Sequence, residues 1–149
     1  MSCAEIIIQE ALPYQAPKLS EIALLAKGHW GYSREQLDSW RVEFLTITPE
    51  YIKENHVWTA SVDGYTAGFA AIEHHGNNSI LEHLWILPDY IGRGIGKTLF
   101  LYVAERFPEF EFTSDPNANT FYEKMGAVKI GESYSVLQDK MLSVFKFTS

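Results

Sequence analysis

Three glycines at alternate positions constrain this chain more than any other feature. Gly92, Gly94 and Gly96 follow an apolar, strand-like run at 80–87 and precede an amphipathic segment with helical spacing. A strand, a tight turn and a helix start together expose successive backbone N–H groups at the positive end of a helix dipole. We therefore expect a turn that binds an anionic, phosphate-bearing ligand.

The spacing of this loop argues against two common nucleotide-binding motifs. A P-loop requires a glycine where this chain has Ile91, although Lys97 and Thr98 follow Gly96 as that motif demands. A dinucleotide fingerprint requires a third glycine where Lys97 or Leu99 stands. A nucleotide-binding protein therefore remains only as a rival class.

The rest of the chain predicts short strands alternating with helices. Apolar and β-branched runs predict strands at 4–9, 57–62, 65–73, 80–87, 110–113, 127–133 and 141–147. Helical spacing and capping residues predict helices at 20–27, from Ser33 (with Gln36 completing a capping box), briefly at 48–50, after Gly96, and from Asp115 to Met125. The order β-α-α-β-β-β-α-β-α-β-β predicts an α/β fold, a mixed sheet with helices on both faces.

Composition excludes several classes of protein. The 149 residues contain no linker or repeat, so we expect a single domain at residues 1–149. Twelve basic against nineteen acidic residues give a net charge of −7, which argues against a nucleic-acid partner, and no apolar run is long enough for a membrane span. The lone Cys3 and the absence of a leader pattern favour a cytoplasmic protein. A monomer and a homodimer both remain open.

The segment 84–97 resembles the acetyl-CoA loop of the GNAT superfamily of N-acetyltransferases, in which Arg/Gln-x-x-Gly-x-Gly/Ala follows a strand. Gly94 and Gly96 match this pattern, and Ile91 replaces its polar first residue. The replacement removes one side-chain contact near the pyrophosphate but leaves the backbone N–H groups of residues 92–97 untouched.

A second segment, residues 115–127, resembles the family's motif helix with its Tyr-Glu-Lys-x-Gly sequence beginning at Tyr122. The strict motif has asparagine seven residues before the tyrosine, where this chain has Asp115. Asn117 is then expected to contact the pantetheine arm. The two motifs and the order of elements extend the resemblance over essentially the whole chain.

The resemblance implies a sheet splayed between its fourth and fifth strands, with acetyl-CoA in the gap. It implies acetyl transfer to a small-molecule or peptide amine by direct attack in a ternary complex. A non-catalytic acyl-CoA-binding module on the same fold is the alternative. The implied cofactor-binding residues are Leu84, Trp85 and Ile86 through their backbone, with Gly92, Arg93, Gly94, Ile95, Gly96, Lys97, Asn117 and Tyr122.

Acetyl transfer requires a neutral amine and a proton donor for the departing thiolate. Tyr122 is the expected general acid, because a phenol can hydrogen-bond that thiolate. Glu82 is the expected base, on the strand face of Leu84 and Ile86, where burial raises the pKa of a carboxylate. His83, on the other face, is the second candidate.

Aromatic residues in the loop between the first two helices suggest a surface that recognises the acceptor. His29, Trp30 and Tyr32 are the expected substrate-binding residues, or alternatively pack as a hinge. Glu73, beside His74 and His75, is a third candidate base. Because these three neighbours alternate between strand faces, we expect no metal site.

Overall fold

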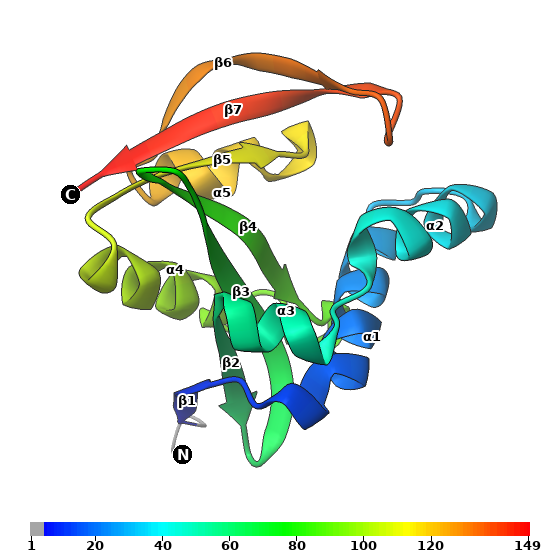
Figure 1. Cartoon of the computed structure of the whole chain (residues 1–149), viewed down its shortest axis with the longest axis vertical. Helices are drawn as coiled ribbons and strands as arrows, with labels where there is room; N and C mark the ends of the chain where they lie inside the picture. Colours follow the sequence, from blue (N-terminus) through cyan, green and yellow to red (C-terminus); the bar gives the residue numbers. More distant parts are fainter. Residues whose placement is uncertain (1–4) are drawn as a thin grey trace.

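The computed structural model describes residues 5–149, which form one seven-stranded mixed sheet (Figure 1). The strand order is β1-β2-β3-β4-β5-β7-β6. The strands are β1 (Ile6–Glu10), β2 (His56–Val62), β3 (Tyr65–His75), β4 (Asn78–Ile86), β5 (Glu109–Ser114), β6 (Val128–Ser135) and β7 (Lys140–Thr148). Ala4, the predicted start of the first strand, lies outside the described residues, as does Cys3.

Within residues 5–149, five α-helices and four shorter helical turns connect the strands. The α-helices are α1 (Ala16–Gly28), α2 (Arg34–Trp40), α3 (Pro49–Glu54), α4 (Ile95–Arg106) and α5 (Asn119–Lys124). The short turns are η1 (Pro13–Gln15), the π-helical η2 (Arg41–Leu45), η3 (Pro88–Tyr90) and η4 (Pro116–Ala118). This order confirms the predicted α/β architecture, with the short turn at 48–50 extended into α3.

The predicted start of the first helix is wrong. Helix α1 begins at Ala16, four residues before the expected start, because Pro17 lies in its first turn, where a missing N–H costs no hydrogen bond. Helix α4 ends at Arg106, so that Phe107 follows the helix as its C-cap. Phe107 packs against the rings of His56 and Trp58.

The sheet splays between β4 and β5, as expected. Neighbouring strands elsewhere pair in long antiparallel ladders, whereas the parallel β4–β5 pair has one register position in the described chain, Ile80 opposite Glu111. The two strands therefore diverge toward their carboxyl ends. Among the residues that the structure describes, this divergence leaves one edge of β4 unpaired after Ile80.

The two faces of the sheet carry separate cores. Helix α4 packs Leu99 and Phe100 onto one face, together with Phe145 of β7. Helix α1 packs Ile22 onto the opposite face, with Phe69 of β3. In Figure 1, α4 lies on one side of strands β2–β4, and α1 and α3 lie on the other. Both helix layers therefore border the gap in the sheet.

A β-bulge in β4 changes which side chains share a face. The register passes from Ala71 opposite His83 to Ile72 opposite Leu81, so Glu82 is the extra residue. Leu81 therefore packs in the same core as Leu84 and Ile86, although simple alternation would separate them. The bulge thus interrupts, at Glu82, the simple alternation that predicts a shared face for Glu82, Leu84 and Ile86.

Candidate active site

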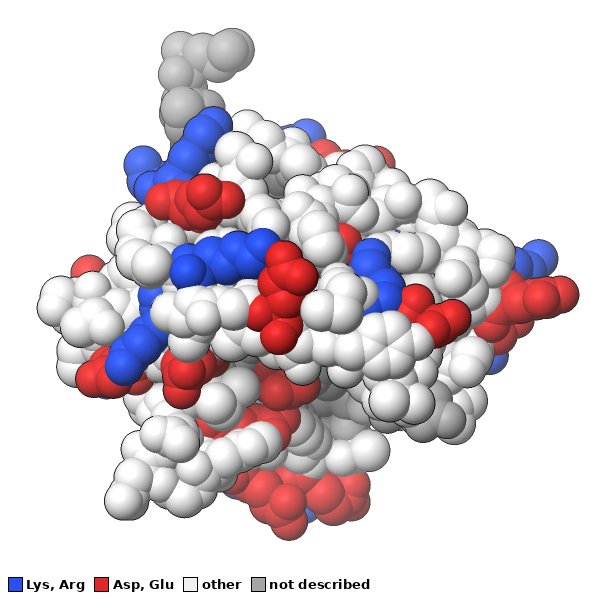
Figure 2. Space-filling view, turned by 90° about the horizontal axis from the view of Figure 1, so that it is seen from above, with Lys and Arg blue, Asp and Glu red and all other residues white. Residues whose placement is uncertain are grey.

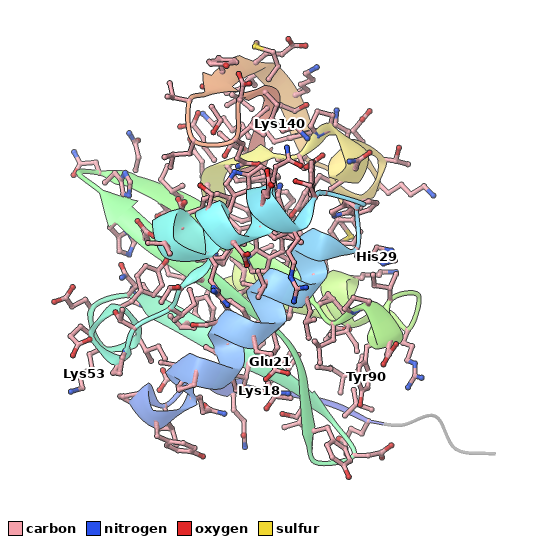
Figure 3. All side chains as sticks on the ribbon, turned by 90° about the vertical axis from the view of Figure 1, so that its right-hand side faces the viewer. Lys18, Glu21, His29, Lys53, Tyr90 and Lys140 are labelled. Carbon is pink, nitrogen blue, oxygen red and sulfur yellow. The ribbon has the colours of Figure 1, made fainter. Side chains whose placement is uncertain are left out.

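A cavity of about 550 Å³ occupies the gap between β4 and β5. The unpaired edge of β4, the glycine loop and α5 form one part of its wall, and the end of α1 with the β6–β7 turn forms another. His29 and Tyr90, both cavity-lining, lie toward the same side of the molecule (Figure 3). One continuous space thus joins the expected cofactor and acceptor regions.

The glycine loop forms an open cradle at the start of α4. Gly92 and Gly94 have φ angles of 86° and 81°, which residues with a Cβ rarely adopt. Within the described chain, no non-neighbouring heavy atom lies within 4 Å of the place where a Cβ would stand on either glycine. The first turn of α4 leaves N–H groups without intrahelical acceptors, since Thr98 N–H bonds to Gly94 O at 3.0 Å. This geometry fits an anionic group such as a pyrophosphate.

The remaining loop residues differ in what their side chains contact. Lys97 is exposed and lines the cavity, as does the half-exposed Ile91. The Arg93 guanidinium lies over the Tyr90 ring, 4.9 Å from its centroid. A Cβ on Gly96 would meet the Phe121 ring at 3.3 Å, so this glycine allows α5 to pack closely against α4.

Strand β4 presents its backbone to the cavity. Leu84, Trp85 and Ile86 pair with β3 along one edge and line the cavity. Because successive N–H and C=O groups of a strand point to opposite edges, some of these groups point into the gap. They are available to an extended ligand arm.

Tyr122 of α5 lies in the cavity wall among aromatic rings. Its ring centroid is 4.5 Å from that of Phe112 and 5.0 Å from that of Phe121. Burial raises the pKa of Tyr122, so its hydroxyl stays protonated at neutral pH. Asn117 also lines the cavity, and its backbone N–H donates to Asp115 Oδ1 at 3.0 Å.

The candidate bases occupy different environments. Glu82 lines the cavity and is exposed to it, and partial loss of solvation together with the nearby Glu73 carboxylate raises its pKa. Glu73 accepts hydrogen bonds from the Tyr51 hydroxyl at 2.6 Å and is paired with His75 Nε2 at 2.9 Å. His74 lies against Ser79 instead, at 3.3 Å. Glu82 is therefore the carboxylate of this group that meets the cavity.

His83 is buried at the cavity wall. It is 6% exposed, and the Trp85 indole N–H donates to its Nδ1 at 2.9 Å. Burial lowers the pKa of His83 to about 4. The imidazole is therefore neutral at pH 7.

The predicted acceptor loop divides between two environments. His29 and Trp30 line the cavity, whereas Tyr32 is directed toward Asp115 and Lys140. The sequence analysis did not assign to the site several residues that also line the cavity, among them Lys27, Phe44, Gln138 and Leu142. Lys27 was detectable in principle, because it extends the otherwise apolar buried surface of α1.

Charged side chains are mixed on the molecular surface. On the face seen in Figure 2, lysine and arginine lie interspersed with aspartate and glutamate. Among residues 5–149, none of the helices has the length and apolar character needed to cross a membrane.

One cavity is bordered by a splayed mixed sheet, a glycine cradle at a helix N-terminus and an unpaired strand edge. This combination fits the site of an acyl-CoA-dependent acyltransferase. Residues 31–137 match the acetyltransferase (GNAT) domain family, and the chain belongs to that family. It is an N-acetyltransferase, and acetyl-CoA is its acetyl donor.

Known proteins resemble the chain over most of its length. It is 27% identical over 123 residues to the peptidyl-lysine N-acetyltransferase YiaC of Escherichia coli (strain K12), covering 80% of this chain and 82% of that protein. The crystal structure of the PaiA N-acetyltransferase from Thermoplasma acidophilum, in complex with coenzyme A, has a TM-score of 0.78 at 20% identity, covering 97% and 99% of the two chains. A GCN5-related N-acetyltransferase from Rhodopseudomonas palustris has a TM-score of 0.77 at 20% identity, covering 100% and 99%.

Proposed function

We propose that this enzyme acetylates lysine side-chain amines in peptides or proteins, by direct attack within a ternary complex. The carrying observation is that Tyr122 and Glu82 line one cavity together with the glycine cradle. A single cavity suits two substrates bound at once. The 27% identity to a peptidyl-lysine N-acetyltransferase supports this class of acceptor.

The cofactor half of the cavity fits acetyl-CoA, which supplies the acetyl group as a thioester when bound. The backbone N–H groups of residues 92–97 would hold the pyrophosphate, with Lys97 adding positive charge. The unpaired edge of β4 at residues 84–86 would bind the pantetheine arm and polarise the thioester carbonyl. Asn117, which lines the same cavity, would contact that arm as well.

Glu82 is the proposed base and accepts the amine proton directly or through water. Its raised pKa brings it nearer the range in which a base works at neutral pH. His83 is the weaker candidate, because its Nδ1 already accepts the Trp85 N–H. Both oxygens of Glu73 have partners, which argues against a role for it as the base.

Tyr122 is the proposed proton donor to the departing sulfur. Its raised pKa keeps the hydroxyl protonated, so that it offers a hydrogen bond to a developing thiolate. Aromatic neighbours hold the ring in place, which fixes the direction of that bond. The same packing would serve a structural tyrosine in a non-catalytic acyl-CoA-binding module.

The acceptor half suits a long aliphatic amine. Trp30, Phe44 and Trp85 supply apolar surface for a methylene chain. The Glu82 carboxylate attracts an ammonium group in solution and then receives its proton. A lysine side chain combines these two properties.

The test uses the full chain, acetyl-CoA and three matched peptides. One peptide has a single lysine and a blocked N-terminus, the second replaces that lysine with arginine, and the third has a free N-terminus and no lysine. We expect thiol release and an acetyl mass increase with the first peptide alone. Acetyl-CoA binding without transfer to the lysine peptide would contradict the proposed acceptor class.

A further inference from the structure

The two carboxylate oxygens of Asp115 contact opposite halves of the cavity wall. Oδ2 accepts from Lys27 Nζ and Lys140 Nζ, each at 3.0 Å, and from the Tyr32 hydroxyl. Oδ1 accepts from the Asn117 backbone N–H at 3.0 Å, which begins the turn leading into α5. One side chain thus joins the acceptor-side segments to the helix that carries the proposed acid.

This group of charges is largely withdrawn from water. The side chains of Lys27 and Asp115 are 3% and 9% exposed, and that of Lys140 is 24% exposed. Lys27 Nζ also donates to Gln138 Oε1 at 2.9 Å. A buried cation requires a countercharge, and removing that countercharge leaves it uncompensated. Asp115 is the carboxylate that both lysines share.

The partners of Asp115 come from three segments that border the acceptor region. Lys27 lies at the end of α1, Tyr32 in the loop before α2, and Lys140 at the start of β7. The Trp40 indole N–H of α2 adds a hydrogen bond to Leu137 O in the β6–β7 turn, at 3.0 Å. Figure 3 shows Lys140 on the β6–β7 side of the molecule, away from Lys18, which lies near the start of α1. These contacts close the acceptor side of the gap.

We propose that Asp115 is a positioning residue for the acceptor, holding the α1 end, the loop at 29–32 and the β6–β7 turn in one arrangement through Oδ2. The inference rests on the proposed acceptor site, because His29 and Trp30 lie within the loop that it fixes. Asp115 stands where the family motif has asparagine. In this chain that position serves acceptor binding more than cofactor binding.

The Asp115→Asn variant distinguishes the contacts of Oδ2 on the acceptor side from the contact of Oδ1 with the turn before α5. An amide can keep Oδ1 as acceptor for the Asn117 N–H, but its nitrogen cannot accept from two ammonium groups. The acceptor side should therefore loosen while the start of α5 stays in place. We expect the KM for the lysine peptide to rise roughly tenfold, with the dissociation constant of acetyl-CoA within about twofold of wild type.

Hydrogen exchange on the free enzyme tests, without any acceptor, whether the contacts of Asp115 Oδ2 hold these segments together. Residues 27–33 and 135–140 should exchange faster in the Asp115→Asn variant, and residues 92–97 should not. The matched control is Glu132→Gln, which changes a carboxylate to an amide in the exposed 3.0 Å pair with Lys129 on β6. The Glu132→Gln substitution should change neither the exchange of residues 27–33 and 135–140 nor the KM for the lysine peptide.

A charge-balanced double variant distinguishes loss of positioning from loss of folding stability. Lys27→Met combined with Asp115→Asn removes the most buried cation and should recover thermal stability, but not the low acceptor KM. Tyr32→Phe removes one contact to Oδ2 and should raise the KM for the lysine peptide by less than Asp115→Asn does. Unchanged exchange at 27–33, or an equal loss of acetyl-CoA affinity in Asp115→Asn, would overturn the proposal. If wild-type enzyme does not acetylate the lysine peptide, the proposed acceptor class is wrong. The exchange result still shows whether Asp115 holds the segments at 27–33 and 135–140 in place.

Discussion

The Trp85 indole N–H donates to His83 Nδ1 at 2.9 Å, and this hydrogen bond fixes the tautomer of the buried imidazole. With Nδ1 occupied as the acceptor, the neutral ring carries its proton on Nε2. Neither ring nitrogen then has a free lone pair for the amine proton. This relationship argues against His83 as the base and supports the proposal that Glu82 fills that role.

The Glu82→Gln variant should lose the acidic limb of the pH profile. The raised pKa of Glu82 means that the wild-type carboxylate is ionised above that pKa and that kcat/KM falls as the pH drops through it. Glutamine removes the proton acceptor, so turnover should fall about 10²-fold with acetyl-CoA affinity nearly unchanged. Steady-state kinetics between pH 4 and 9 would measure this. A limb that follows the pKa of different acceptor amines and ignores the mutation would exclude Glu82.

The Tyr122→Phe variant should slow turnover without weakening acetyl-CoA binding. Loss of the hydroxyl removes a hydrogen bond to the departing sulfur, for which we expect a decrease in kcat of roughly 10²-fold. The control is Tyr102→Phe, because Tyr102 of α4 packs against Trp58 of β2 and is not among the cavity-lining residues of the described chain. If both variants lose only thermal stability, Tyr122 is a packing residue.

Gly94→Ala should weaken acetyl-CoA binding at least tenfold. Alanine at a φ of 81° costs about 1 kcal/mol of strain, and its Cβ would occupy the open cradle. Gly64→Ala is a close control, since Gly64 has a φ of 83° in the β2–β3 turn and equally open surroundings within the described chain. Calorimetry should show lost affinity for the first variant alone. Equal acetyl-CoA affinities of the Gly94→Ala and Gly64→Ala variants would contradict the proposal that the glycine loop binds the cofactor.

His83 should make stability depend on pH. Its pKa of about 4 in the folded chain lies below the ordinary value of 6.5, so as pH falls the unfolded chain binds the proton first. The free energy of unfolding should therefore drop by about 2 kcal/mol between pH 7 and pH 5. Urea denaturation at both pH values would show this drop in wild type and most of it abolished in His83→Gln. The exposed His74→Gln is the control and should retain the drop.

Local sequence signals were sufficient for several elements. The Ser33–Gln36 spacing predicts a capping box, and both reciprocal hydrogen bonds form, at 3.0 and 3.1 Å. Asp63 and Gly64 predict a tight hairpin, and both have positive φ. Such signals act between residues a few positions apart, so their physical cause is contained in the sequence pattern.

The arrangement of the site depended on the tertiary structure. The bulge that displaces Glu82 arises from the register between β3 and β4, and alternation along β4 contains no sign of it. Lys27 and Asp115 lie 88 residues apart in the chain, and folding brings Lys27 Nζ and Asp115 Oδ2 to 3.0 Å from each other. The sequence by itself determined the glycine cradle, the helix caps and the order of elements, because these follow from short-range spacing. Strand register and long-range packing decided which side chains face the cavity and which charges share a partner, because those depend on segments that meet only in the folded chain.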